Sequence, residues 1–459
     1  MSIRNIILLG LFTGFAAAVF FAGDLEYSGK LSLVIFTLSL GMFIFSSIPA
    51  GLVAWLCLSA GVVLGLPQEI LFTSFNTHVV WLMIGAFIIA AVLEKSGLLK
   101  RLIRWVQKNC YSRGRVTLFT FVLVQILSVV IPSTSGRASA LLPIYRAFGS
   151  QFGRNKKFFG LAIPVLILMA ANTTLIGAGS HIIGIGILEA QTDRTISYMS
   201  FLIYGMPFGL LIGGISLYLL SKWYLKNMEF PEVQAQGAEE ESEPLSNHEK
   251  KALWLIGITL ALWLTEAFHG FDIAFVTMLM SMIMMLPQAG LISWKEGLQN
   301  VSWSLIFFVA GATALGELLV TYKVTDYFQE RFLSIFSTLD VTNEFIMLML
   351  IALISVTSHL YITSHTTRAV VFIPVLLIFA DMFTLNPSAV VFIALIGINY
   401  CVTLPVSSKA LLIFYEEDDR PFTTRDLVKV SMWLMPLYIL LMVVTYYVFW
   451  QHLGLSLMG

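Results

Sequence analysis

Charged residues are scarce in this chain of 459 residues: they make up 12% of the sequence, whereas soluble domains carry about 25%. The 27 basic and 27 acidic side chains balance each other, so no excess of one sign indicates nucleic acid as a partner. Hydrophobic residues account for 58% of the chain. This composition excludes an ordinary soluble protein and predicts an all-α integral membrane protein that crosses the bilayer several times.

Cysteines and catalytic motifs are also sparse. Cys57, Cys110 and Cys401 are isolated, so the sequence has neither a disulfide framework nor a metal-binding spacing. It contains no Gly-x-x-x-x-Gly-Lys-Ser/Thr loop, which argues against an ATP-driven pump. Paired acids and a nucleophile spacing are missing as well. We therefore expect no enzyme, no organic cofactor and no resident metal, with a sodium ion or a proton left as a possible coupling ion.

The apolar segments differ in length. The N-terminal segment reaches Gly23 with one arginine, and because further apolar segments follow at once, we expect a first membrane helix there rather than a signal peptide. A spanning helix needs about 20 apolar residues, and several segments are shorter. Non-helical backbone at membrane depth must be buried in protein or line a cavity. The short segments therefore predict broken helices or re-entrant hairpins.

A short polar pattern occurs twice inside apolar stretches. Residues 133–138 read STSGRA and residues 364–369 read SHTTRA, and in each copy a proline stands ten residues after the first serine. An arginine inside a membrane segment costs about 2.5–3.5 kcal/mol by insertion scales and therefore indicates a function. Two matched polar islands predict one binding site built from two halves.

Other landmarks repeat in the same order, which indicates an internal duplication. Trp81 leads toward Glu94 in the first half, and Trp303 leads toward Glu317 in the second. Basic residues flank the first motif on both sides, which places both ends of its segment in the cytoplasm by the positive-inside rule. The loop of residues 381–387 after the second motif has no basic residue. We therefore expect inverted repeats, with the first hairpin opening inward and the second outward.

The domain organisation follows from this duplication. We expect a first membrane repeat over residues 1–225, an acidic cytoplasmic linker over 226–250 and a second membrane repeat over 251–459. The special elements are expected as a hairpin near 116–149 and a broken helix near 158–190 in the first repeat, and a hairpin near 344–382 and a broken helix near 388–415 in the second. Residues 98–108 alternate basic and apolar side chains at helical spacing, which fits a surface-lying helix or a solvated connection.

At these residues the chain resembles the divalent anion:sodium symporter family of dicarboxylate, citrate and sulfate carriers. The family has a Ser-Asn-Thr motif in each half, ahead of a proline, at the tips of two opposed hairpins, and residues 133–135 and 364–366 occupy these positions. Residues 79–102 are similar to the helix before the first hairpin, and residues 173–177 to the unwound stretch after it. The resemblance implies a homodimeric, elevator-type carrier with about 11 membrane helices in the cell (inner) membrane.

The resemblance and the residue chemistry together define the candidate site. The residues expected to bind substrate are Ser133, Thr134, Ser135, Arg137, Ser364, His365, Thr366 and Arg368. The residues expected near a coupling ion are Asn172, Thr173, Thr174, His181, Asn399, Thr403 and Lys409. The planar fork of each arginine suits a carboxylate or a sulfate. As an alternative, each arginine pairs with a buried acid or caps carbonyls in its own hairpin.

Other candidates also have a structural alternative. His365 is able to couple transport to protons near neutrality, or it serves only as a hydrogen-bonding residue in the helix bundle. Lys409 replaces a cation or contacts the substrate, unless it snorkels to the interface. The asparagines and threonines are also suited to ordinary hydrogen bonds between helices.

The chain departs from the family pattern inside the motifs. Thr134 and His365 replace the asparagines with which the family binds substrate and sodium, and Arg137 and Arg368 are not part of the usual motif. In our interpretation a fixed guanidinium replaces a bound cation. Proton symport or anion exchange is therefore favoured over sodium symport.

We accordingly predict a secondary active transporter of small divalent anions that works by alternating access. Dicarboxylates are the expected substrates, followed by sulfate or sulfonates. The alternatives are an anion or oxyanion efflux permease, and an anion channel or sensor on the same fold. A carrier saturates and shows counterflow, whereas a channel conducts without saturation at low substrate concentration.

Overall fold

The computed structural model describes residues 12, 14–20, 25–46, 48–99, 101, 102, 104, 113–131, 133–151, 155–192, 194–225, 244–327 and 343–458. Within these residues the secondary structure is helical, apart from one isolated bridge between Leu385 and Met458. Much of the expected N-terminal helix, most of the expected surface helix at 98–108 and residues 226–243 of the expected linker lie outside the described residues.

The first half of the chain forms the elements α2 (Tyr27–Phe45), α3 (Ala50–Val63), α4 (Glu69–Thr73), α5 (His78–Lys95), α7 (Arg113–Val130), α8 (Thr134–Gln151), α9 (Lys156–Ala170), η2 (Ala171–Thr173), η3 (Leu175–Gly177), α10 (Gly179–Thr192) and α11 (Tyr198–Tyr224). The second half forms α12 (Asn247–Leu264), α13 (Glu266–His269), α14 (Ile273–Met285), α15 (Trp294–Gln299), α16 (Trp303–Thr321), α18 (Glu344–Thr357), η4 (Ser358–Leu360), α19 (His365–Met382), α20 (Pro387–Ile398), η5 (Pro405–Ser407), α21 (Lys409–Tyr415) and α22 (Thr424–Thr445). A π-helical turn at Tyr446–Trp450 and a short turn at Gln451–Leu453 follow α22.

The lengths of these helices fit a bilayer. Seven helices in the described residues are long and apolar enough to cross a membrane, and five further apolar helices are shorter, with 10–17 residues each. The all-helical class is confirmed, and the chain is a multi-pass membrane protein. Three of the five short helices, Gly114–Val130, Glu344–Leu360 and Pro387–Ile398, lie next to a polar motif or an unwound segment, where full spans are not expected.

The expected linker is shorter than predicted, because α12 begins at Asn247 and residues 247–250 are helical. The Ser246 hydroxyl accepts a hydrogen bond from the Glu249 amide, and the Glu249 carboxylate accepts one from the Ser246 amide. This capping box satisfies two amides at the start of the helix. The acidic composition of the segment therefore concealed a helix start.

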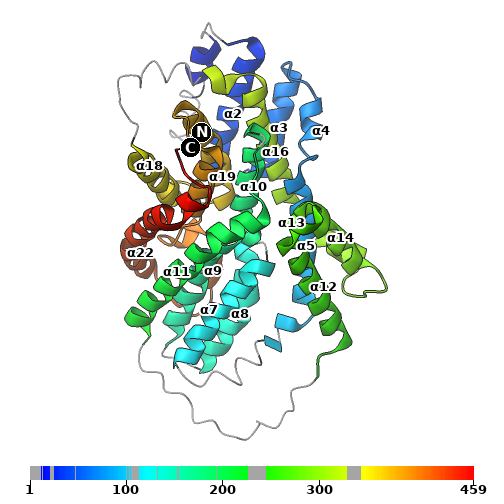
Figure 1. Cartoon of the computed structure of the whole chain (residues 1–459), viewed down its shortest axis with the longest axis vertical. Helices are drawn as coiled ribbons and strands as arrows, with labels where there is room; N and C mark the ends of the chain where they lie inside the picture. Colours follow the sequence, from blue (N-terminus) through cyan, green and yellow to red (C-terminus); the bar gives the residue numbers. More distant parts are fainter. Residues whose placement is uncertain are drawn as a thin grey trace, which may run out of the picture.

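Each polar motif lies where two helices meet. The pair α7 and α8 meets at Ser133, and the pair α18 and α19 meets around Ser364. Along the long axis of the molecule, the first pair lies toward the lower end of Figure 1 and the second pair lies higher. The two motifs therefore approach the middle of the molecule from different ends.

Each pair is followed by a helix that unwinds in the interior. The backbone after α9 passes through the turns η2 and η3 before α10 begins, and the backbone after α20 passes through η5 before α21. Helix α11 packs closely on the first unwound segment, because a side chain at Gly205 or Gly209 would collide with Asn172 or Thr173. Small residues permit such close approach of helix backbones in membranes.

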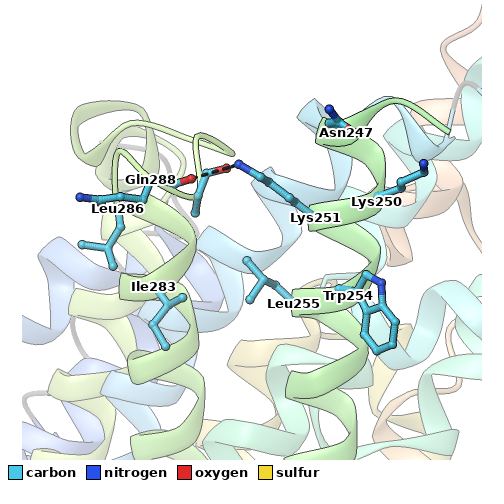
Figure 2. Close-up of a pocket in the computed structure, with 9 residues that line it drawn as sticks. Asn247, Lys250, Lys251, Trp254, Leu255, Ile283, Leu286 and Gln288 are labelled. Carbon is cyan, nitrogen blue, oxygen red and sulfur yellow. Dashed lines mark hydrogen bonds between the residues drawn. The ribbon is translucent and has the colours of Figure 1, made fainter.

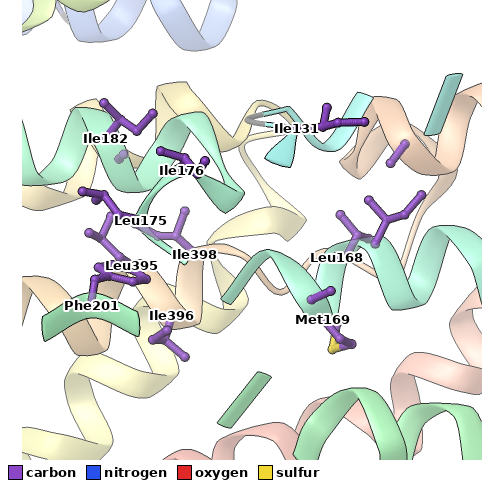
Figure 3. Close-up of a cluster of buried hydrophobic side chains, with 14 of the residues drawn as sticks. Ile131, Leu168, Met169, Leu175, Ile176, Ile182, Phe201, Leu395, Ile396 and Ile398 are labelled. Atoms are coloured by element: carbon purple, nitrogen blue, oxygen red, sulfur yellow. The ribbon is translucent and has the colours of Figure 1, made fainter. Parts of the chain in front are cut away.

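Apolar side chains surround both unwound segments. Figure 3 shows these side chains on α9, α10, α11, α20 and the unwound backbone, and the labelled residues are Ile131, Leu168, Met169, Leu175, Ile176, Ile182, Phe201, Leu395, Ile396 and Ile398. A second, separate apolar cluster joins α2 and α3 to the C-terminal part of α16. The first unwound segment is thus enclosed in protein, whereas Val406 of the second is 55% exposed, and both situations fit the rule that non-helical backbone at membrane depth is buried or lines a cavity.

Candidate functional site

The two polar motifs line one cavity of about 860 Å³. One wall is made by residues 133–136 at the start of α8, by residues 363–367 at the start of α19, and by Lys409 at the start of α21. The remaining lining includes the start of α3, residues of α5 and residues around the start of α16. The duplication therefore brings both motifs to a single space, although they are far apart in the sequence.

Each motif presents a pair of hydroxyls to this cavity. Ser133 Oγ and Ser135 Oγ lie 3.0 Å apart. Ser364 Oγ and Thr366 Oγ1 also lie 3.0 Å apart. These residues stand at the beginnings of two 18-residue helices, where backbone amides and the helix dipole attract anions.

The first serine of each motif also caps its helix. The Gly136 amide donates to Ser133 Oγ at 3.2 Å, and the Thr367 amide donates to Ser364 Oγ at 3.3 Å. A serine cap satisfies one of the amides that a helix start leaves without an intrahelical partner. The caps hold the hydroxyl pairs in the same position relative to both helices.

The two arginines lie behind the motifs and do not line the cavity. Arg137 and Arg368 are both 0% exposed. Arg137 donates through Nη2 to the carbonyl of Gly177, and Arg368 donates through Nη1 to the carbonyl of Tyr400 at 3.2 Å. Both carbonyls belong to unwound segments. Each arginine therefore joins a hairpin to an unwound segment, rather than capping carbonyls of its own hairpin.

Neither arginine has an acidic partner among the described residues. No carboxylate there forms an ion pair with Arg137 or Arg368, and two guanidinium nitrogens on each have no hydrogen-bond partner. A guanidinium stays protonated in proteins. Two uncompensated positive charges thus lie directly behind the hydroxyl pairs, and a negative charge in the cavity would compensate them.

A buried polar network connects the two unwound segments. Asn399 donates through Nδ2 to Asn172 Oδ1 at 3.0 Å and contacts His181 Nε2, and its Oδ1 accepts from Ser180 Oγ at 3.1 Å. His181 Nδ1 lies 3.0 Å from the carbonyl of Thr174. A carbonyl only accepts, so Nδ1 carries the proton and Nε2 accepts from Asn399. The network therefore holds His181 as a neutral imidazole.

The neighbouring threonines have protein partners. Thr173 donates to Gln125 Oε1 at 3.1 Å, and Thr174 donates to the carbonyl of Ser128 at 3.1 Å. Asn172 donates to Tyr438 Oη at 2.9 Å. These contacts tie the first unwound segment to α7 and to α22.

A second buried chain of polar groups was not anticipated from the sequence. His359 Nε2 lies 2.7 Å from Thr403 Oγ1, which lies 2.6 Å from Ser431 Oγ. Ser431 in turn contacts Tyr400 Oη at 2.9 Å. His359 and Ser431 carry no repeated motif, so only the fold reveals that they support the second unwound segment.

His365 differs from the other histidines because it lines the cavity. Its Nε2 lies 2.9 Å from Cys401 Sγ, and its Nδ1 has no hydrogen-bond partner in the described part of the chain. Lys409 and Glu94 bring one charge of each sign to the lining. Glu94 on α5 was not among the expected site residues, because the sequence marks it only as a landmark of the repeat.

The structure thus divides the expected site residues into layers. Those that line the cavity are Ser133, Thr134, Ser135, Ser364, His365, Thr366 and Lys409. Those that lie behind it, buried or partly buried, are Arg137, Arg368, Asn172, Thr173, Thr174, His181, Asn399 and Thr403. The described residues contain no group of three or more His, Cys, Asp or Glu side chains arranged to hold a metal ion.

Comparison with known proteins gives matches over almost the whole chain. The model of one protein family, described as the sodium:sulfate symporter transmembrane region, matches residues 9–456. Among solved structures, the YdaH transporter of Alcanivorax borkumensis has a TM-score of 0.62 at 12% identity, covering 95% of this chain and 100% of that one. Neisseria gonorrhoeae MtrF has a TM-score of 0.51 at 13% identity, covering 95% of this chain and 97% of that one. At these identities the likeness concerns the fold alone.

Curated relatives are similar over shorter stretches. A membrane protein of Cupriavidus necator is 23% identical over 321 residues, which cover 66% of this chain and 61% of the relative. The Escherichia coli inner membrane protein YbhI is 24% identical over 277 residues, 57% of each chain. The Escherichia coli L-tartrate/succinate antiporter is 26% identical over 269 residues, 53% of this chain and 52% of the antiporter. The matches thus span between about half and three fifths of these relatives.

Proposed function

Because the chain belongs to the sodium:sulfate symporter family, we propose that it is a secondary active transporter of small divalent anions in the inner membrane. The family and the antiporter relative support the transport of an anion. The choice of a divalent anion depends on the site itself. Dicarboxylates are the first candidates, in keeping with the name of the antiporter relative, and sulfate or sulfonates come next.

The observation that carries this proposal is the shared cavity. Two hydroxyl pairs at helix starts face one space, and two buried guanidinium groups without acidic partners lie behind them. Hydroxyls and helix-start amides donate to an anion, and its two negative charges would balance the two arginines. Lys409 adds a further cationic group to the lining, opposed by Glu94.

We also propose that the arginines act in place of bound cations. Arg137 and Arg368 each hold a carbonyl of an unwound segment, which is a position where a metal cation would find oxygen ligands. A carrier with such fixed charges has no need of sodium. Anion exchange or proton symport is therefore the proposed mode of coupling, with His365 as the residue available for proton coupling.

The proposed mechanism is alternating access by two inverted repeats. The placement of the two helix pairs along the long axis supports this arrangement (Figure 1). The part that carries both motifs would move as a rigid body against the wall formed by α3, α5 and α16, in a homodimer. Substrate bound between the motifs would then be exposed to each side of the membrane in turn.

The test is thermal stabilisation of the purified protein by dicarboxylates, citrate, sulfate and sulfonates, with and without sodium. A ligand at 100 times its dissociation constant adds about 2.7 kcal/mol of apparent stability. We expect one class of divalent anion to stabilise the protein regardless of sodium. Stabilisation only with sodium would contradict the role of the arginines. The absence of any shift would contradict the substrate class, and transport without saturation or counterflow would favour a channel.

A further inference from the structure

A second hollow lies far from the candidate transport site, between α12 and α14. It has a volume of about 600 Å³ and is lined by Asn247, Lys250, Lys251, Trp254, Leu255, Ile283, Leu286, Gln288 and Ala289. In Figure 2, Lys251 and Leu255 lie on the side of α12 that faces α14, and Ile283 and Leu286 lie across from them. This groove, which we call the α12–α14 groove, has apolar walls and a basic rim.

The basic rim has no acidic partner. Lys251 donates through Nζ to the carbonyls of Gln288 at 3.0 Å and Ala289 at 3.3 Å, so one of its three donors is left. Lys250 is exposed and forms no ion pair with any described residue. The Lys251 ammonium therefore lies across the mouth of the groove, while the Lys250 ammonium lies on the side of α12 that faces away from α14 (Figure 2), and neither forms an ion pair with a described carboxylate.

The acidic residues near this rim are already occupied. Glu249, next to Lys250 in the sequence, pairs with Arg101 at 2.9 Å. Glu296 on α15 pairs with Lys95 at the end of α5 at 2.7 Å. These pairs place the first turn of α12, the end of α5 and α15 at one boundary of the helical bundle. Neither of these two carboxylates is therefore left to pair with Lys250 or Lys251.

The walls indicate what kind of anion fits. Trp254 is 73% exposed and Leu286 is 50% exposed, at the edge of the groove. Leu255 and Ile283 extend the apolar surface along the helices, away from the lysines (Figure 2). Tryptophan and lysine together are typical of the membrane interface. A free inorganic anion would make no use of the apolar walls.

We infer that the α12–α14 groove binds an anionic phospholipid. The phosphate of the headgroup lies at Lys251, with Lys250 adding positive charge from the neighbouring side of α12, and an acyl chain follows Leu255 and Ile283. Basic pockets between membrane helices on the cytoplasmic side are suited to anionic headgroups. The lipid would contact both α12 and α14, and neither helix carries one of the two polar motifs.

The experiment is native mass spectrometry of the purified full-length protein with equal amounts of phosphatidylglycerol and phosphatidylcholine. We expect the protein to retain phosphatidylglycerol in preference. A lysine near an anionic lipid contributes a factor of about five in affinity, so Lys250→Gln with Lys251→Gln should weaken retention roughly 25-fold. Lys295→Gln is the matched control, because Lys295 is exposed on α15 at the same boundary but does not line the groove.

A second variant keeps the lysines and fills the groove. Ile283→Trp should displace the acyl chain and lower retention of phosphatidylglycerol while the charge is unchanged. This variant is needed because Lys251 donates to the carbonyls after α14, so that its replacement could also disturb the local fold. Ile283→Trp leaves these hydrogen bonds in place. Equal retention by the wild type and all variants would overturn the inference.

The test also covers competition by the acidic residues that precede α12 in the sequence. If residues 239–243 covered the rim, the wild type would show no preference, and replacing their four glutamates by glutamine would create one. That result would overturn lipid as the occupant. Loss of lipid in the Lys295→Gln control would likewise overturn it, because it would indicate a general surface charge effect instead of a groove.

Discussion

The two hairpin tips, residues 133–137 where α7 and α8 meet and residues 364–368 where α18 and α19 meet, can be compared directly. They share the arrangement of their hydroxyls, their helix caps and their arginines. In both, two hydroxyls lie 3.0 Å apart and the first serine caps the following helix. In both, an arginine four residues after that serine is fully buried and donates to an unwound segment. These common features are the ones that a divalent anion requires, namely donors in front and positive charge behind.

The two tips differ at the residue between the hydroxyls. The first tip has Thr134 there, and the second has His365, whose Nε2 is 2.9 Å from Cys401 Sγ. The arginines also reach carbonyls at different places, since Gly177 ends the turn η3 whereas Tyr400 lies just after α20. The arginine and the two hydroxyls are therefore the repeated part of the candidate site. The residue between the hydroxyls is the position at which the two halves differ in the chemistry they offer to a bound anion.

The largest expected effect comes from removing the arginines. Arg137→Ala or Arg368→Ala removes a buried positive charge, and a hydrogen-bonding contact with a charged group contributes roughly 1.5–3 kcal/mol. We expect anion binding to fall by roughly 10- to 150-fold in either variant. Lysine should restore little, because it lacks the planar fork. Uptake into proteoliposomes and size-exclusion profiles measure function and folding separately.

The control for this pair is Arg194→Ala, because Arg194 is exposed and does not line the cavity. Equal losses in the two arginine variants would support the equivalence of the tips. A large loss in only one would mean that the tips share a geometry but not a role. Unchanged binding in both would remove the arginines from the site.

The hydroxyl pairs come next in size. Ser133→Ala and Ser364→Ala each remove a donor to the anion and a helix cap. We expect about a tenfold weaker affinity from the lost hydrogen bond and about 1 kcal/mol less stability from the lost cap. The affinity is measured by ligand-dependent thermal shift, and the stability by the midpoint without ligand.

Ser197→Ala separates these two effects. Ser197 caps α11 by accepting from the Ser200 amide at 3.1 Å, and it does not line the cavity. It should reproduce the loss of stability with unchanged affinity. If it also weakened anion binding, the tip serines would act through helix stability and would not be ligands.

A smaller effect is expected from exchanging the residues between the hydroxyls. His365→Thr makes the second tip like the first, and Thr134→His makes the first like the second. A neutral hydrogen bond contributes about 0.5–1.5 kcal/mol, so affinity should fall between two- and tenfold in His365→Thr if the imidazole in the cavity lining bonds to the anion. Binding curves for a dicarboxylate and for sulfate would show whether His365 sets the preference. Identical curves for both variants and the wild type would make this position neutral.

The sequence was sufficient for the class, the family and the pairing of the motifs. Low charge, long apolar segments and the repeated pattern predicted a helical membrane protein, and the family match confirms the resemblance. The meeting of residues 133–135 and 364–366 in one cavity agrees with a site built from two halves. These inferences depend on composition and on an internal repeat, and both can be read from the sequence without knowledge of the fold.

The rest depended on packing. The side chain of Arg137 turns away from the cavity because the chain unwinds after α9 and leaves the carbonyl of Gly177 without a helical partner. The residues around Arg137 in the sequence do not predict where this carbonyl will lie. Glu94 was recognised only as a landmark of the repeat, and His359 belongs to no repeated pattern; both acquire their surroundings from distant helices. The start of α12 was missed because a capping box was hidden in an acidic segment.

The smallest expected effect sharpens the contrast between arginines that have a carboxylate and those that do not. Arg101, at the membrane boundary, donates to the Glu249 carboxylate and lowers the pKa of that carboxyl to about 2. The pKa of a glutamate in an unfolded chain is about 4.3. The stability from this pair is therefore complete above about pH 4.3 and is lost as the pH falls toward 2.

We expect the thermal midpoint of the wild type to fall more steeply than that of Glu249→Gln between about pH 5 and 3, because glutamine has no proton to take up in that range. Anion binding at neutral pH should be the same in both proteins, since Arg101 already has its counter-charge within the chain and does not line the cavity. Parallel pH curves would mean that the pair contributes nothing to stability. A change in anion affinity would mean that charge at this boundary reaches the cavity, so that the positive potential there would not come only from Lys409 and the two unpaired arginines.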